Sequence, residues 1–285
     1  MKGSGTVTIS IAEKAGRPWW LWLHVLSLDA VLVALVGQEA FAHVAGVVLG
    51  GSDRLLLALC AWLAYCGDRL LDGRRLKMKA TMARHRFAQR HFDRLKSLWF
   101  LALLAVALLA WQLPLFERQA GLVLLTLVAG YFFLQHHQTT RQQAGRWKEL
   151  MVGVGFAGGT VFFVIARAEL SVGLVCLGMA WAVACVQNCL VVAGWDRDAD
   201  RAMDQPSMAR NVSGIHRWLL IGLLVQFALV GIAVLSNGPW LKLGGALLLS
   251  GALLGELERR GMHWDAEQRR VWADAVLLCP LLTLA

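Results

Sequence analysis

Residues 171–204 read SVGLVCLGMAWAVACVQNCLVVAGWDRDADRAMD, and this stretch decides the class of fold. No charged residue occurs between Ser171 and Trp195, and this run is longer than the roughly 20 residues that a helix needs to cross a bilayer. Several aspartates follow directly where the apolar run ends. The stretch therefore predicts a transmembrane helix that ends in an acidic segment at the membrane surface.

The rest of the chain has the same apolar character. Its 285 residues are 58% hydrophobic and only 16% charged, and the mean hydropathy is +0.55. A soluble domain of this length would carry more charge. Backbone polar groups in lipid must be satisfied within their own segment, so long apolar runs predict helices. We expect an all-α integral membrane protein with a single transmembrane domain over residues 1–285.

The apolar residues fall into about nine segments, which predict about nine transmembrane helices. The first is over-long, and a tilt or a break is expected near residues 37–39, which read Gly-Gln-Glu. The last is short. The segments are residues 18–49, 53–72, 93–113, 117–136, 148–167, 171–196, 214–235, 239–259 and 267–285.

Lysine and arginine are concentrated in alternate connections. They gather in the tail 1–17, in the basic loop 73–92 and around the Asp-rich loop 197–213, whereas the opposite connections carry few. The positive-inside rule then places the N-terminus and these loops in the cytoplasm, and we expect the plasma (inner) membrane. The same rule accounts for the net charge of +9, so we expect no nucleic-acid partner.

Two segments end in aspartates spaced by one helical turn, both on the basic side. Asp68 and Asp72 end the second segment, and Asp196, Asp200 and Asp204 end the sixth. Residues i and i+4 share a helix face, so each set presents its carboxylates together. Like charges at this spacing near lipid are unfavourable, because repulsion and desolvation both oppose ionisation. We therefore expect a cation between the two faces.

Mg²⁺ is the cation that this pattern favours. It binds a few carboxylates, keeps several waters and completes its shell with phosphate oxygens. Opposed carboxylate pairs with Mg²⁺ can stabilise a departing diphosphate. The competing interpretation is that these are ordinary acidic residues paired with nearby arginines such as Arg74, Arg75, Arg197 and Arg201. Two pairs at matching spacing on one side of the membrane favour the metal site.

In this nine-segment plan the motifs resemble those of the UbiA superfamily of intramembrane prenyltransferases. The family has NxxxDxxxD at the end of helix two and DxxxD at the end of helix six; Asp68 and Asp72 match the first motif, and Asp196 and Asp200 match the second. The Gly-rich stretch 148–159 resembles helix five of the family. The resemblance covers almost the whole chain. It implies a UbiA-like bundle with a central cavity open to the cytoplasmic side, and Mg²⁺ held by these four catalytic aspartates.

By the same resemblance, the expected activity is transfer of a prenyl group from an allylic prenyl diphosphate to a lipophilic or aromatic acceptor within the membrane. One position departs from the family, because Ala64 stands where the first motif has Asn. Tyr65, three residues before Asp68, shares the aspartate face and can donate a phenol hydrogen bond. The departure leaves two alternatives: a terpene cyclase of the same superfamily, or a catalytically silent relative that binds a polyprenyl lipid.

Further residues are expected to bind the substrate. Arg69 lies between the first two aspartates, Lys148 begins the fifth segment and Arg210 follows the second motif. Cationic side chains suit a diphosphate, although each one alone is also typical of an anchor at the membrane surface. Asn188 extends the aspartate face of the sixth segment inward, and Asp204 extends it outward.

An acid also occurs inside the ninth segment, at Asp274. An ionisable group within a membrane segment is unfavourable unless it is paired or lines a cavity. We therefore expect Asp274, in the cytoplasmic half, to have a partner or to face the cavity.

Overall fold

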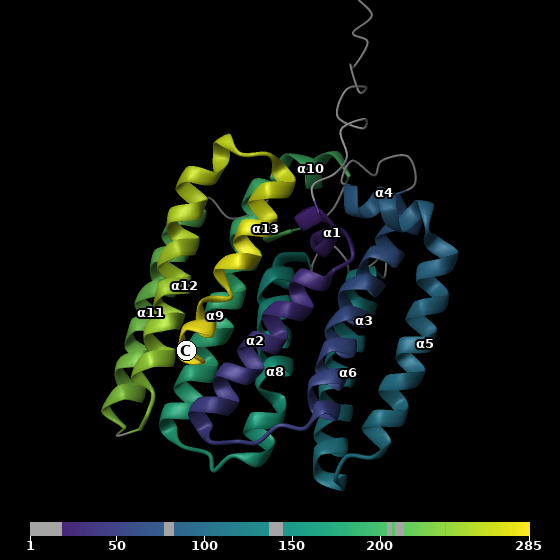
Figure 1. Ribbon diagram of the computed structural model, residues 1–285. Helices are drawn as coiled ribbons and strands as arrows, with labels where there is room; N and C mark the ends of the chain where they lie inside the picture. Colours follow the sequence, from purple (N-terminus) through teal and green to yellow (C-terminus); the bar gives the residue numbers. More distant parts are fainter. Residues whose placement is uncertain (1–18, 77–82, 137–144, 204–206, 209–213, 237) are drawn as a thin grey trace, which may run out of the picture.

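The described residues of the protein, 19–76, 83–136, 145–203, 207–208, 214–236 and 238–285 in a computed structural model, form helices without strands (Figure 1). The longer helices run side by side. The α-helices are α1 Trp19–Val25, α2 Leu28–Ala45, α3 Gly51–Leu76, α4 Ala83–Arg90, α5 Phe92–Trp111, α6 Leu115–His136, α8 Lys148–Arg167, α9 Val172–Trp195, α10 Arg197–Ala202, α11 Ile215–Leu235, α12 Leu241–Arg260 and α13 Ala266–Val276. Short 3₁₀ turns are η2 Gly145–Trp147, η4 Gly261–His263 and η5 Cys279–Thr283.

Among the residues that the structure describes, six helices are long and apolar enough to cross a membrane: α2, α5, α6, α8 together with η2, α9 and α11. This confirms the prediction of an all-helical, multi-pass membrane protein. The count of nine spans stays a prediction, since α3 and α12 are long but end in charged residues. The eleven residues of α13 extend only about 16 Å, about half of a bilayer core of about 30 Å.

The first segment does break, but the predicted position near residues 37–39 is wrong. The backbone turns at Ser27, which has a positive φ of 62° and separates α1 from α2. Trp62 of α3 donates its indole N–H to the carbonyl of Leu26 at 3.1 Å, which satisfies a backbone group at the break. Gly37 instead allows close packing, because a Cβ there would lie 3.1 Å from the ring of Trp181.

The core is built around α9. Its Leu177, Trp181 and Ala184 are fully buried against α8, α11 and α12. Figure 1 places α8 and α9 in the middle of the bundle, α5 at one edge, and α11 and α12 at the other. None of the α5 residues is buried, and its surface is rich in exposed leucines. An apolar outer helix of this kind suits contact with lipid.

The two ends of the bundle differ in their polar groups. At one end, Arg167 of α8 donates to both carboxylate oxygens of Asp53 of α3, at 2.6 and 2.9 Å. The same guanidinium donates to both oxygens of Glu117 of α6, at 2.7 and 2.9 Å. This cluster joins three helices at their ends. The short helices α4 and α10 lie at the opposite end (Figure 1), where the aspartate motifs are found.

Candidate functional site

The two aspartate motifs end α3 and α9. Asp68 and Asp72 are in the last turns of α3, Asp196 directly follows α9, and Asp200 lies in α10. The backbone N–H of Asp200 donates to the carbonyl of Asp196 at 2.7 Å, so one helical turn continues from α9 into α10. The i, i+4 spacing of the second motif is therefore kept, although α9 itself has ended.

Lys148 is within electrostatic reach of both motifs. It is the first residue of α8, and the charges of Asp68 and Asp72 of α3 and of Asp200 of α10 act on its ammonium group. Carboxylates from two helices far apart in the sequence thus influence one cation. This convergence is what a shared anion site needs, since a lysine offers a point charge to phosphate oxygens.

The four aspartates do not close around a single point. Within the described part of the chain, the one group of three His, Cys, Asp or Glu ligand atoms within 4.8 Å of one another lies elsewhere, at His24, Asp29 and Asp274. Mg²⁺ takes one or two carboxylates and completes its shell with water and phosphate. A single ion held directly by three or four of these aspartates is therefore not what the described residues show.

Asp196 is held by arginines from two other helices. The buried Arg270 of α13 donates from Nε to Asp196 Oδ2 at 3.1 Å and from Nη2 to the other oxygen. Arg84 of α4 approaches the same carboxylate at 3.9 Å. Sequence reasoning did not single out Arg270. The sequence does contain a hint of its role, because Arg270 lies one helical turn before Asp274 in an apolar segment.

Burial changes the protonation of two groups at this end. The pKa of Asp200 is raised to about 6, chiefly because burial disfavours the carboxylate; Lys148 and Arg84 act in the opposite direction. The pKa of His85 is lowered to about 3 by burial and by the adjacent Arg84, so this histidine is neutral. A buried carboxylate with a raised pKa is one that a bound cation would stabilise. Asp200 therefore fits the role of a ligand for Mg²⁺.

The companion residues divide into three sets. Arg69 is turned toward α1, where it donates to the carbonyls of His24 and Val25 at 2.7 and 2.6 Å, so it fastens the end of α1. Tyr65 and Asn188 line a pocket deeper in the bundle. The predicted residues Asp204 and Arg210 lie outside the residues that the structure describes.

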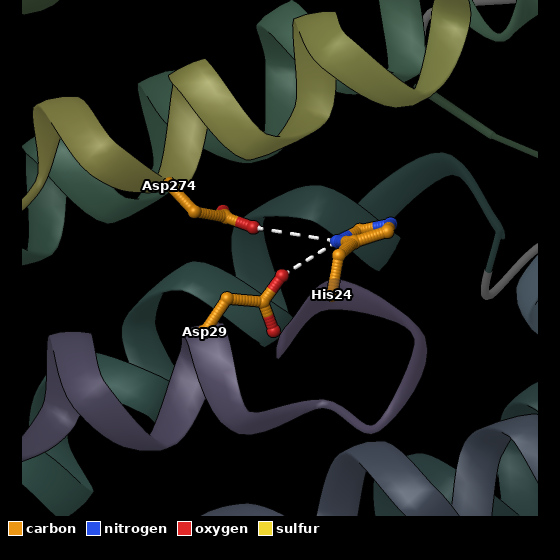
Figure 2. A group of neighbouring side chains, drawn as sticks. All are labelled: His24, Asp29 and Asp274. Atoms are coloured by element: carbon orange, nitrogen blue, oxygen red, sulfur yellow. Dashed lines mark hydrogen bonds and ion pairs between the residues drawn. The ribbon is translucent and has the colours of Figure 1, made fainter. Parts of the chain in front are cut away.

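A buried polar cluster adjoins that pocket (Figure 2). His24 Nδ1 lies 2.5 Å from Asp29 Oδ2 and 4.0 Å from Asp274 Oδ2. Asn188 donates to the other oxygen of Asp274 at 3.4 Å. The expectation that Asp274 has a partner or lines a cavity is confirmed on both counts, since it also lines the pocket. Sequence reasoning missed Asp29, whose signal is an acid in the first turn of an apolar helix.

Comparison with known proteins adds no relative. No family model, no curated protein and no solved structure matches the chain. The resemblance to the UbiA superfamily therefore rests on the motifs and their placement.

Proposed function

We propose that the protein is a Mg²⁺-dependent prenyltransferase of the UbiA type. It would transfer a prenyl group from an allylic prenyl diphosphate to a lipophilic or aromatic acceptor within the bilayer. The proposal includes a nine-span bundle whose site faces the cytoplasm, because the basic loops adjoin the aspartates.

One observation carries the proposal. Asp68 and Asp72 of the first motif and Asp200 of the second all act electrostatically on Lys148, at one end of an apolar bundle. In this proposal an anionic head group would bind among these groups, and the isoprenoid tail would extend toward the membrane interior. Arg84, which reaches toward Asp196, adds a second cation on the α4 side.

In this proposal the aspartates and Lys148 bind the substrate and promote its ionisation. Asp68 with Asp72, and Asp196 with Asp200, would each hold Mg²⁺, which neutralises charge on the departing diphosphate. Lys148 would hold the diphosphate between the two pairs. As the C–O bond of the allylic diphosphate breaks, the electron pair would leave with the diphosphate; the acceptor would then attack the cationic carbon and lose a proton to water.

A second candidate is a catalytically silent relative that binds a polyprenyl lipid. Two observations favour it. Ala64 offers no ligand where the family has Asn, and Arg270 already occupies both oxygens of Asp196. A protein that only binds a lipid needs a cavity for the lipid, but it does not need a second motif whose carboxylates are available to bind metal. The two candidates differ in whether diphosphate is released.

Purified protein with Mg²⁺ and geranyl, farnesyl or geranylgeranyl diphosphate tests the proposal through diphosphate release. We expect Asp68→Asn and Asp200→Asn to slow release by about 100-fold, in the range seen when groups that support a metal are lost. Asp198→Asn is the matched control, because Asp198 lies in the same acidic stretch and its side chain is 96% exposed. It should release diphosphate at the wild-type rate.

The outcomes separate the candidates. Release that persists unchanged in both Asp68→Asn and Asp200→Asn would refute the proposed site. Tight co-purification of a polyprenyl lipid with no release from any of the three diphosphates would favour the silent relative. Release with terpene products formed in the absence of any acceptor would indicate a cyclase.

A further inference from the structure

Two largely buried carboxylates converge on one histidine without an arginine beside them. Asp29 of α2 and Asp274 of α13 point toward His24 Nδ1 of α1 (Figure 2), at 2.5 and 4.0 Å. Asp53 and Asp196, in contrast, each pair with an arginine. Within the described part of the chain, the imidazole of His24 is the one basic group within 4.0 Å of either carboxylate of the cluster. Two adjacent carboxylates in a buried place are unfavourable unless a cation or a proton lies between them.

The histidine has a carboxylate at each of its ring nitrogens. Asp29 and Asp274 face Nδ1, and Glu267 of α13 faces Nε2 at 3.6 Å. A neutral imidazole has one N–H, so it can donate on one side only. When that proton is on Nε2, the lone pair of Nδ1 points toward the oxygens of Asp29 and Asp274. Metal-bound histidines have this arrangement, because they usually donate their other N–H to a carboxylate.

The three candidate ligand atoms have nearly the spacing that a small divalent ion needs. One atom each from His24, Asp29 and Asp274 lies within 4.8 Å of the other two. Ligands that are about 2.0–2.2 Å from a tetrahedral ion are about 3.3 Å from one another. The distances of 2.5 and 4.0 Å from Nδ1 to the two carboxylates lie on either side of this value. Side-chain shifts of less than about 1 Å would therefore complete the site.

A pocket beside Asp274 offers a place for one more ligand. Asp274 and Asn188 contribute polar groups to its lining, and it has room for about one water molecule. Asn188 donates to Oδ1 of Asp274 at 3.4 Å, whereas Oδ2 of the same carboxylate faces His24. An ion held by the three side chains would thus have a water on its pocket side, as zinc sites with three protein ligands do.

The ligand types select among the divalent ions. Mg²⁺ prefers oxygen ligands, which suits the aspartate motifs better than a site with an imidazole. Imidazole nitrogen suits Zn²⁺ and the neighbouring transition-metal ions. Two carboxylates and one neutral imidazole carry two negative charges, which one divalent ion balances.

We propose that His24, Asp29 and Asp274 bind a divalent transition-metal ion, with Zn²⁺ as the expected ion. The ion takes the place of the proton between Nδ1 and Asp29, and that proton leaves to water. Glu267 is a positioning residue that accepts the N–H of Nε2. The ion joins α1 and α2 to α13. This site is separate from the Mg²⁺ site proposed at the aspartate motifs, and it does not depend on prenyl transfer.

Titration of metal-free, tag-free protein in detergent with Co²⁺ tests the site. Co²⁺ with a nitrogen ligand and four or five ligands in all absorbs strongly in the visible region, whereas octahedral Co²⁺ with oxygen ligands absorbs weakly. Wild type should gain the strong band, keep it in millimolar Mg²⁺ and lose it when Zn²⁺ is added. His24→Gln should lack the band, and Glu267→Gln should bind Co²⁺ about ten- to hundredfold more weakly. His43→Gln is the matched control, because His43 is exposed on α2, and it should behave as wild type does.

Thermal unfolding gives a second measurement and shows whether the variants fold. Zn²⁺ should raise the unfolding midpoint of wild type and of His43→Gln but not that of His24→Gln, because binding to the folded state stabilises it. Asp29→Asn removes a single carboxylate oxygen and should also lack the Co²⁺ band, which guards against misfolding of His24→Gln.

Three results would overturn the proposal. A strong Co²⁺ band that is equal in wild type and His24→Gln would place the ion elsewhere. Loss of the band in Asp68→Asn, with retention in Asp29→Asn, would assign it to the aspartate motifs. Absence of the band from folded wild type would mean that protons, and not a metal ion, hold the carboxylates of the cluster together.

Discussion

Replacing Asp200 with asparagine should stabilise the protein above pH 6, while it removes a carboxylate that we propose binds Mg²⁺. The pKa of Asp200 is about 6 in the folded protein, against an ordinary value of 3.8. The folded state therefore binds this proton more tightly than the unfolded state. Stability falls as the pH rises from about 4 to about 6, and the ionised carboxylate costs about 1–3 kcal/mol above that range. Asparagine carries no charge and avoids this cost.

The assay is thermal unfolding of the detergent-purified protein at pH 5 and pH 8. At pH 8 the Asp200→Asn variant should unfold at a higher temperature, by about 2–4 °C for each kcal/mol. The difference should shrink at pH 5, where the wild-type carboxylate is mostly protonated. Millimolar Mg²⁺ should raise the midpoint of wild type more than that of the variant, because ligand binding to the folded state stabilises it.

Two results would refute this reasoning. If Asp200→Asn unfolds at a lower temperature than wild type at pH 8, burial does not penalise the carboxylate. If the difference between the two proteins is the same at pH 5 and pH 8, it does not come from ionisation of Asp200. The exposed Asp198→Asn variant should match wild type at both pH values and excludes a general effect of charge in α10.

Two further substitutions test the contacts that join the helices of the bundle. Arg167→Gln should lower the free energy of unfolding by about 1–3 kcal/mol, because Asp53 and Glu117 lose the guanidinium that donates to both, while this arginine is itself 28% exposed; denaturant or thermal unfolding measures it. Gly153→Ala should destabilise by about 1–3 kcal/mol, since a Cβ there would lie 2.6 Å from the backbone of α9, whereas Gly155→Ala, which meets open space, should be neutral or slightly stabilising.

The arginine prediction has its own control at the same end of the bundle. Arg54 pairs with Glu39, but both side chains are about a third or more exposed. Solvent screens such a pair, so Arg54→Gln should cost at most about 1 kcal/mol. An equal loss of stability in Arg54→Gln and Arg167→Gln would contradict the distinction between the exposed and buried pairs. An unchanged midpoint in Gly153→Ala would contradict the close contact of α8 with α9.

The apolar segments and the residues that end them could be predicted from the sequence, because both depend on residues that are close together in the chain. The charge-free run before Asp196 is long enough to require a membrane helix, and α9 fills it. The predicted position of the break in the first segment was wrong, because a glycine that interrupts a helix and a glycine that allows close packing look alike in a sequence. Gly37 was expected to interrupt the helix, but it admits the Trp181 ring, and the interruption is at Ser27.

The candidate site was readable only in part. Spacing alone predicted that Asp68 and Asp72 share a face, and that Asp196 and Asp200 do, because i, i+4 neighbours are fixed by the helix itself. Spacing could not show that Arg69 turns away to fasten α1. The direction of a long side chain depends on which backbone carbonyls a neighbouring helix leaves unsatisfied, and those come from residues 44 and 45 positions away.

The sequence by itself determined that this chain enters the membrane as helices and carries two acidic turns, because hydropathy and helix periodicity act over one or a few turns. Only the tertiary structure decided which groups meet. It brought Lys148 within electrostatic reach of both motifs, placed Arg270 on Asp196, and joined His24 to Asp274. These contacts depend on how α8, α9 and α13 pack, and packing is set by the shapes of many side chains at once.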